Sequence, residues 1–244
     1  MNDASERRVG ASLREPASLA RTHGLLLPRG APVWPGARIA IATVPVAAAT
    51  ARAWLPHALR AADPARATIF VAEYPSTSFG VAYREAGVLL HAHRFGRELV
   101  HCAWMVVDDD RALILGRELL GFPKKLAQID FALADGLVQA RVSRRGTTLV
   151  ALDGRAPQRA EAQPAFPLPI ANVRPGPGVL PAPLLRMRVP ERPHAGWTDR
   201  FALRVEGSAA VTGLPSSVMR PASGARSPAT SGASPGRRRR ASGP

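Results

Sequence analysis

Cysteine is almost absent from the sequence, which contains a single one, Cys102, in 244 residues. One thiol excludes a disulfide within the chain and any zinc cage built from cysteines, as is typical of proteins in a reducing compartment. Apolar runs are also short: none approaches the roughly 20 residues that cross a bilayer, and the polar first ten residues do not resemble a signal peptide. We therefore expect a cytoplasmic protein without membrane spans.

Acidic residues are scarce relative to basic ones: 33 lysines and arginines against 18 aspartates and glutamates give a formal net charge of +15. Part of this excess lies in residues 215–244, which contain six arginines and no acidic residue. That stretch is otherwise mostly serine, proline, alanine and glycine, and it predicts a disordered tail over 216–244. Aromatic residues make up only 5% of the chain. Without a basic helix or interleaved aromatics, nucleic-acid binding is not expected outside the basic tail.

Lysine is rare, because the 33 basic residues include only two lysines, Lys124 and Lys125, and these are adjacent. Two lysines placed at random in a chain of this length would be neighbours about once in a hundred trials. Arginine serves well for surface charge but keeps its proton near neutral pH, whereas lysine can lose its proton and act as a nucleophile. The pair therefore indicates a chemical requirement for an amine.

Hydrophobic patterning predicts a mainly β (α+β) domain over residues 37–215, after an N-terminal arm over 1–36. Segments 49–61 and 111–120 are expected to be helices, with an N-cap for the second within Asp108–Asp110. Runs of β-branched and apolar residues predict strands at 38–46, 67–74, 79–94, 99–107, 125–132, 137–143, 147–152, 184–189 and 200–205. The three strands between 125 and 152 are expected to be antiparallel, and the proline-rich residues 154–183 to be a connection. This pattern is more typical of a barrel than of a doubly wound sheet.

The segment from Gly116 to Leu126, GRELLGFPKKL, is the most specific motif in the chain. Its proline fixes the backbone after the second helix, and Phe122 is an apolar neighbour that can exclude water from the lysines. A lysine with a pKa of about 10.4 is a free amine in only about one molecule per few thousand at pH 7. Burial and a nearby cation both lower that pKa, so an enclosed pair predicts a neutral, nucleophilic lysine. The alternative is a solvated turn whose cations lie at the helix end.

This segment resembles the signature of the acetoacetate decarboxylase family, which is Gly-Arg-Glu-Leu, a short spacer and then Pro-Lys-Lys-Leu. Residues 83–85 (Tyr-Arg-Glu) resemble the family's Tyr-x-Glu strand, and Arg38 falls where the family has an arginine near the substrate carboxylate. Residues 194–197 and 207–215 resemble later family motifs. The resemblance covers about residues 28–215 and implies a cone-shaped or partly open antiparallel β-barrel with a few flanking helices.

The resemblance also implies a role for each site residue. Neutral Lys124 would attack the ketone carbon of a β-keto acid, and the resulting imine would accept the electron pair released with carbon dioxide; the family's type enzyme is a standard example of such a lysine. Lys125 would contribute positive charge or positioning, and Glu85 would orient the substrate or transfer a proton. Arg38 would bind the substrate carboxylate, and Phe122 would line the substrate site.

No metal and no organic cofactor is implied, because the imine is itself the electron sink. The expected partners are a small keto acid, with acetoacetate foremost, and further copies of the chain in a homo-oligomer. Histidines 91, 93 and 101 do not change this expectation, since no acidic residue at suitable spacing completes a zinc site with them. Two simpler interpretations stay open: Glu85 pairs with an arginine, and Arg38 is an ordinary surface arginine.

One residue departs from the family pattern. Aligned without gaps, Phe70 stands where the family commonly has a second glutamate, unless a shift in register brings Glu73 to that place. The missing carboxylate leaves open a Schiff-base aldolase or dehydratase that acts on another keto acid. A non-catalytic small-molecule binder of the same fold is a further alternative, as is a nucleic-acid-associated protein that relies on its basic tail.

Overall fold

The computed structural model describes residues 32–134, 137–155, 158–160, 164–173, 184–189, 191, 196–198 and 201–205. Within these residues the chain forms two helices, α3 (Ala48–Trp54) and α4 (Asp110–Leu120). The strands are β1 (Arg38–Pro45), β2 (Arg60–Ala61), β3 (Arg66–Tyr74), β4 (Tyr83–Arg94), β5 (Arg97–Val107), β6 (Lys124–Leu126), β7 (Gln128–Ala134), β8 (Leu137–Arg144), β9 (Thr147–Arg155), β10 (Gln158–Ala160), β11 (Ile170–Val173), β12 (Leu184–Met187), β13 (Gly196–Thr198) and β14 (Phe201–Val205). The expected mainly β fold with a few helices is thus confirmed.

An eight-stranded sheet forms the centre of the structure, with the order β1-β3-β4-β5-β11-β12 and with β2 on β4 and β6 on β5. Strands β1, β3, β4 and β5 are antiparallel neighbours. The β4–β5 hairpin turns at Phe95 and Gly96, whose φ angles of 50° and 72° are those of a tight hairpin turn. In contrast, β5 pairs in parallel with both β6 and β11, so the sheet is mixed rather than purely antiparallel.

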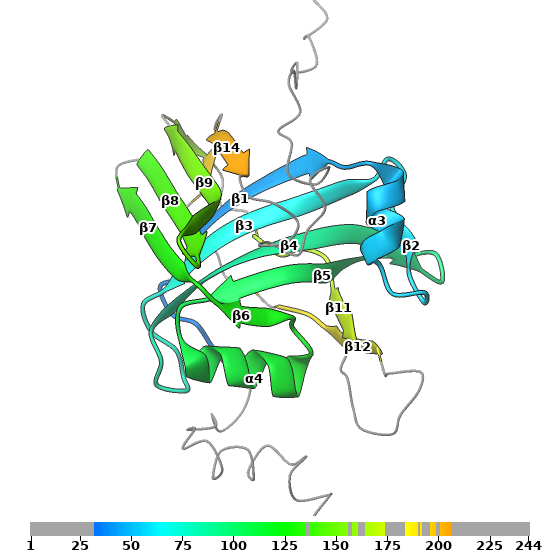
Figure 1. Cartoon of the computed structure of the whole chain (residues 1–244), viewed down its shortest axis with the longest axis horizontal. Coiled ribbons are helices and arrows are strands. Elements are labelled where there is room, and N and C mark those ends of the chain that lie inside the picture. The colour runs from blue at the N-terminus through cyan, green and yellow to red at the C-terminus, as the bar shows by residue number, and fades with distance from the viewer. Residues whose placement is uncertain are drawn as a thin grey trace, which may run out of the picture.

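A four-stranded sheet, β14-β9-β8-β7, packs against one face of the long sheet, as Figure 1 shows. Alternate residues of β3, such as Ile69 and Val71, meet Ile129, Val142 and other residues of this second sheet in one apolar cluster. The intervening residues of β3, such as Phe70, point to the other face and join a second apolar cluster. Helix α4 lies on that second side, next to β6. The two faces of the long sheet therefore have separate cores.

Several expected elements differ in length from the structure, and the strand expected over 79–94 begins only at Tyr83. The first helix ends at Trp54 rather than near residue 61, because Pro56 disfavours helical geometry in the residue before it, and Leu55 is extended. The expected strand 125–132 is divided at Ala127 into β6, which belongs to the long sheet, and β7, which belongs to the four-stranded sheet. Residues 154–183, expected to be a connection, include the end of β9 as well as β10 and β11.

Barrel closure stays a prediction, because the sheets of the described residues are not paired with one another into a closed barrel. The expected tail, most of the arm, and residues 194–195 and 207–215 lie outside the described residues. The division into arm, domain and tail is therefore also still a prediction. No helix among the described residues has the length and hydropathy to cross a membrane.

Candidate functional site

Helix α4 positions the lysine motif. The Asp109 side chain accepts a hydrogen bond from the Ala112 backbone N–H at 2.9 Å and thereby caps the helix, as the sequence predicts. The helix ends at Gly121, whose φ of 67° lies in the left-handed region that favours glycine. The Gly121 and Phe122 N–H groups then donate to carbonyls of the last helical turn, and the chain reverses into β6. This reversal places the lysine motif alongside β5.

The Lys124 side chain is enclosed and only 6% exposed. Its Nζ lies 2.9 Å from Glu85 Oε2 and donates a hydrogen bond to the Ala112 carbonyl at 3.3 Å. The same Nζ lies 5.3 Å from the ring centroid of Tyr83 and 5.8 Å from that of Phe122. The structure therefore brings together three of the expected site residues: Lys124, Glu85 and Phe122.

Two further residues of the motif support Lys124, and neither was assigned a role from the sequence. A Cβ atom added at Gly116 would lie 2.6 Å from both Cδ and Cε of Lys124, so a larger residue here would displace the lysine side chain. Arg117 Nη1 donates to the Lys124 carbonyl at 3.1 Å and fixes the backbone of β6. In the sequence, Gly116 and Lys124 are linked only by their places in one motif, where the glycine lies eight residues before the lysine.

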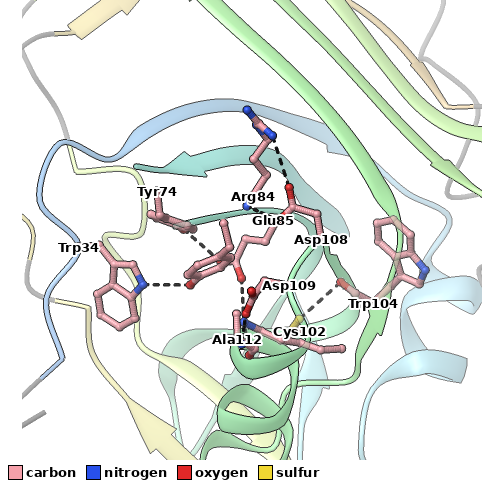
Figure 2. A network of polar contacts seen from close by, with 11 residues as sticks. Trp34, Tyr74, Arg84, Glu85, Cys102, Trp104, Asp108, Asp109 and Ala112 are labelled. Carbon is pink, nitrogen blue, oxygen red and sulfur yellow. Dashed lines mark hydrogen bonds and ion pairs between the residues drawn. The ribbon is translucent and has the colours of Figure 1, made fainter. Parts of the chain in front are cut away.

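Glu85 is held by a buried tyrosine that sequence analysis missed. The Tyr74 hydroxyl donates to Glu85 Oε1 at 3.1 Å (Figure 2). Trp34 Nε1 donates to the Tyr83 hydroxyl at 2.9 Å, and the rings of the two tyrosines lie 4.9 Å apart. Burial, and next the negative charge of Glu85, raise the pKa of both tyrosines. Tyr74 is therefore a neutral, permanent donor to the carboxylate.

Lys125 does not share the environment of Lys124. It is exposed, whereas Lys124 is buried, because adjacent side chains of a strand point to opposite faces. In the described residues, the charged side chain paired with Lys124 is the Glu85 carboxylate and not a second cation. The expectation that Lys125 adds positive charge next to the reactive amine is thus not supported by this arrangement, and its role stays a prediction.

Arg38 lies on the other face of the long sheet. It is the cross-strand partner of Glu73, and the two side chains form an ion pair. Arg84 also pairs with Glu73, at 3.0 Å. Cross-strand partners share a face and sequence neighbours do not, so Glu85 points away from this cluster. The structure therefore does not bring Arg38 to Lys124, and substrate binding by Arg38 stays a prediction.

Phe70 points to the same face as Lys124, at the position where the family commonly has its second glutamate. It is 1% exposed and belongs to the apolar cluster beneath α4. Glu73 does not replace the missing carboxylate, because the observed register turns it to the opposite face, between Arg38 and Arg84. The site consequently contains one carboxylate from these strands, that of Glu85.

His91 of β4 and His101 of β5 have structural contacts. His91 Nε2 lies 2.8 Å from Thr68 Oγ1, and Arg66 Nε donates to His91 Nδ1 at 3.2 Å. His101 Nδ1 lies 2.8 Å from the Ala171 carbonyl. Burial is the main cause that lowers the pKa of both histidines. Among the described residues, no three histidine, cysteine or acidic side chains are grouped as metal ligands would be.

The arrangement has the chemistry of a nucleophile and its base. An amine and a carboxylate 2.9 Å apart are within the range over which a proton can pass between them. The free amine produced would face Tyr83 and Phe122 rather than bulk water.

Comparisons with known proteins bear on this site. The sequence model described as acetoacetate decarboxylase (ADC) matches residues 18–215. The acetoacetate decarboxylase of Ralstonia nicotianae is 32% identical over 128 residues, which are 49% of this chain and 51% of the relative. The chain thus spans about half the length of this curated relative.

Two solved structures show the same fold at low sequence identity. Acetoacetate decarboxylase from Legionella pneumophila superposes with a TM-score of 0.69 at 17% identity, and the match covers 84% of each chain. The enduracididine biosynthesis enzyme MppR, solved with pyruvate, gives a TM-score of 0.63 at 19% identity over 70% of this chain and 76% of its own. The family match includes most of the chain and the whole lysine motif. The chain therefore belongs to the acetoacetate decarboxylase family.

Proposed function

We propose that this protein is a carboxy-lyase that removes carbon dioxide from acetoacetate or a related β-keto acid through a Schiff base on Lys124. The observation that carries the proposal is the buried contact between Lys124 of the family's lysine motif and Glu85 of β4, with 2.9 Å between Nζ and Oε2. Such a pair supplies both a nucleophile and a group that takes its proton. The rarity of lysine and the family resemblance point to these residues, and the contact supports the proposal that Lys124 is the nucleophile and Glu85 the base.

Imine formation begins with transfer of one proton from the Lys124 ammonium to Glu85. The free Nζ attacks the ketone carbon, and one Nζ proton passes to the former ketone oxygen to form a hydroxyl. The proton on Glu85 then returns to this hydroxyl, which leaves as water. The products are a protonated imine and an ionised Glu85, so the charge of the pair is conserved. Tyr74 keeps Glu85 in place throughout, because its hydroxyl donates to the other carboxylate oxygen.

Decarboxylation follows from the electron demand of the protonated imine. The bond between the α-carbon and the carboxylate breaks, its electron pair moves toward the imine nitrogen, and carbon dioxide leaves an enamine. A proton added to the enamine carbon gives the imine of the product ketone, and water then releases the ketone and regenerates Lys124. This sequence requires no metal and no organic cofactor, since the imine nitrogen accepts the electrons.

A second candidate is the same imine chemistry without loss of carbon dioxide, as in an aldolase or dehydratase. It is favoured by Phe70, which leaves the site with a single strand carboxylate for proton transfer. It is also favoured by the fold of MppR, a structure of which holds the condensation product of pyruvate and imidazole 4-carboxaldehyde. The two candidates share Lys124 and differ in whether carbon dioxide appears.

Reductive trapping tests the proposal. Sodium borohydride added with acetoacetate reduces an imine to a stable amine, and we expect one covalent adduct per chain, located on Lys124 by peptide mapping. A non-catalytic binder would give no adduct, and this result would overturn both candidates. Measured release of carbon dioxide then separates decarboxylation from aldolase or dehydratase chemistry. Lys124→Arg is the matched control, because it keeps the positive charge and cannot form the imine.

A further inference from the structure

Phe70 lies in one row of residues with Lys124 across four strands. In the register of the sheet, Phe70 of β3 is opposite Gly87 of β4, Gly87 is opposite Met105 of β5, and Met105 is opposite Lys124 of β6. Residues opposite one another on neighbouring strands share a face of the sheet. The row therefore runs directly from the reactive amine to the Phe70 side chain, beneath α4.

The Phe70 ring occupies the space that Gly87 leaves. A Cβ atom added at Gly87 would lie 2.6 Å from Cε1 and 2.9 Å from Cζ of this ring. On another side the ring meets Phe166 edge to face, with centroids 5.0 Å apart. The ring is thus fixed above β4, the strand that also carries Glu85. Both Phe70 and Met105 are almost completely buried, so this end of the row is apolar.

The spacing along β4 limits what can fit between the amine and the ring. Glu85, which contacts Lys124 Nζ, and Gly87, which lies under the ring, are two residues apart, or about 7 Å. The ring and the Lys124–Glu85 contact are therefore neighbours on one face of β4, so a long arm on the imine carbon would meet the ring where a methyl group would not.

We infer that Phe70, seated over Gly87, limits the length of the hydrocarbon arm on the ketone carbon of the substrate. This inference rests on the proposed function, because it assumes an imine at Lys124. It assigns short-arm β-keto acids, with one or two carbons beyond the ketone carbon, as the substrate class. The apolar row also excludes a second carboxylate from this end of the site.

A competition experiment tests the inference. The protein is treated with borohydride in an equal mixture of acetoacetate and 3-oxohexanoate, and the two adducts are counted by mass, both before and after loss of carbon dioxide. We expect the acetoacetate adduct to dominate in the natural sequence. In Phe70→Ala the ratio should move at least tenfold toward 3-oxohexanoate, and in the milder Phe70→Leu it should move in the same direction. Because both acids compete in one sample, the folded fraction cancels from the ratio.

Phe131→Ala is the matched control, since Phe131 is an equally large side chain in the core on the opposite face. Its adduct ratio should equal that of the natural sequence. The inference is overturned if neither Phe70 variant changes the ratio while acetoacetate adducts still form, or if Phe131→Ala changes it equally. Absence of any adduct on Lys124 in the natural sequence is a different result, which overturns the proposed function itself.

Discussion

At the scale of single residues, the two adjacent lysines have opposite surroundings, and this difference predicts opposite behaviour. We expect Lys124→Arg to abolish imine trapping, because arginine keeps its proton and cannot form the imine. Lys125→Arg should retain trapping within about threefold, since Lys125 is exposed and a cation is preserved. Intact-mass measurement after borohydride treatment gives both values. Equal and small losses in the two variants would contradict the assignment of Lys124 as the nucleophile.

Because Glu85 contacts Lys124, we expect replacement of Glu85 to lower both stability and activity. Glu85→Gln leaves a buried ammonium without its anion, which costs about 3 kcal/mol of the free energy of unfolding. Without the base, imine formation should slow about a hundredfold. Urea unfolding and the trapping rate measure the two effects.

The double variant Glu85→Gln with Lys124→Met is the control for this pair. It removes both charges, so it should be more stable than Glu85→Gln alone, even though it carries an additional substitution. Strictly additive losses would show that the two side chains are not energetically coupled. The natural pair would then be a contact without consequence for stability.

The buried contact of Lys124 with Glu85 involves two residues that were singled out from the sequence, whereas the surroundings of this pair could not be predicted. The rarity of lysine and the Gly-Arg-Glu-Leu motif point to Lys124, and the Tyr-x-Glu strand points to Glu85. Tyr74 was missed because its contact with Glu85 depends on the pairing of β3 with β4. The separation of Lys125 from Lys124 was also not expected, since sequence proximity suggested Lys125 as a charged neighbour of the amine. Side chains adjacent in sequence are separated by the alternation of a strand.

At the scale of elements, helix α4 and strand β6 act as one unit, because Gly116 of the helix touches the lysine of the strand. Glycine to alanine in a helix usually stabilises by about 1 kcal/mol. We expect the opposite for Gly116→Ala, since its Cβ would displace Lys124: a lower melting temperature and at least a tenfold slower trapping rate. Glu118→Ala, an exposed position on the same helix, is the control and should leave trapping unchanged. A stabilised, fully active Gly116→Ala would contradict the close contact.

Elements with a strong local pattern were predicted well, and those that depend on distant partners were not. Strands β1, β3 and β5 and helix α4 lie within one or two residues of their expected bounds. Strand β11 escaped prediction because it is four residues long, follows a proline-rich stretch and is stabilised by β5, which lies far away in the sequence. The boundary between β6 and β7 is set by a change of sheet at Ala127, for which a continuous strand pattern contains no signal.

At the scale of the whole molecule, tyrosine ionisation reports whether the chain is folded. The chain contains two tyrosines, and burial raises the pKa of both Tyr74 and Tyr83 above the ordinary value of about 10. Above that pH the unfolded chain releases protons that the folded chain keeps, so the free energy of unfolding falls as pH rises. We expect tyrosinate absorbance to appear only together with loss of the near-ultraviolet circular dichroism signal. Ionisation of one tyrosine near pH 10 in a folded sample would contradict the buried network.

The apolar row of Phe70 and Met105 has a consequence for the medium in which the proposed reaction occurs. Once the imine has formed, its positive nitrogen and the substrate's carboxylate are opposite charges, and departure of carbon dioxide cancels them. A step in which charge disappears is faster in a weakly polar solvent than in water, because water stabilises the charged starting state. These buried side chains replace water with hydrocarbon-like surroundings beside the proposed imine, which would favour the proposed loss of carbon dioxide.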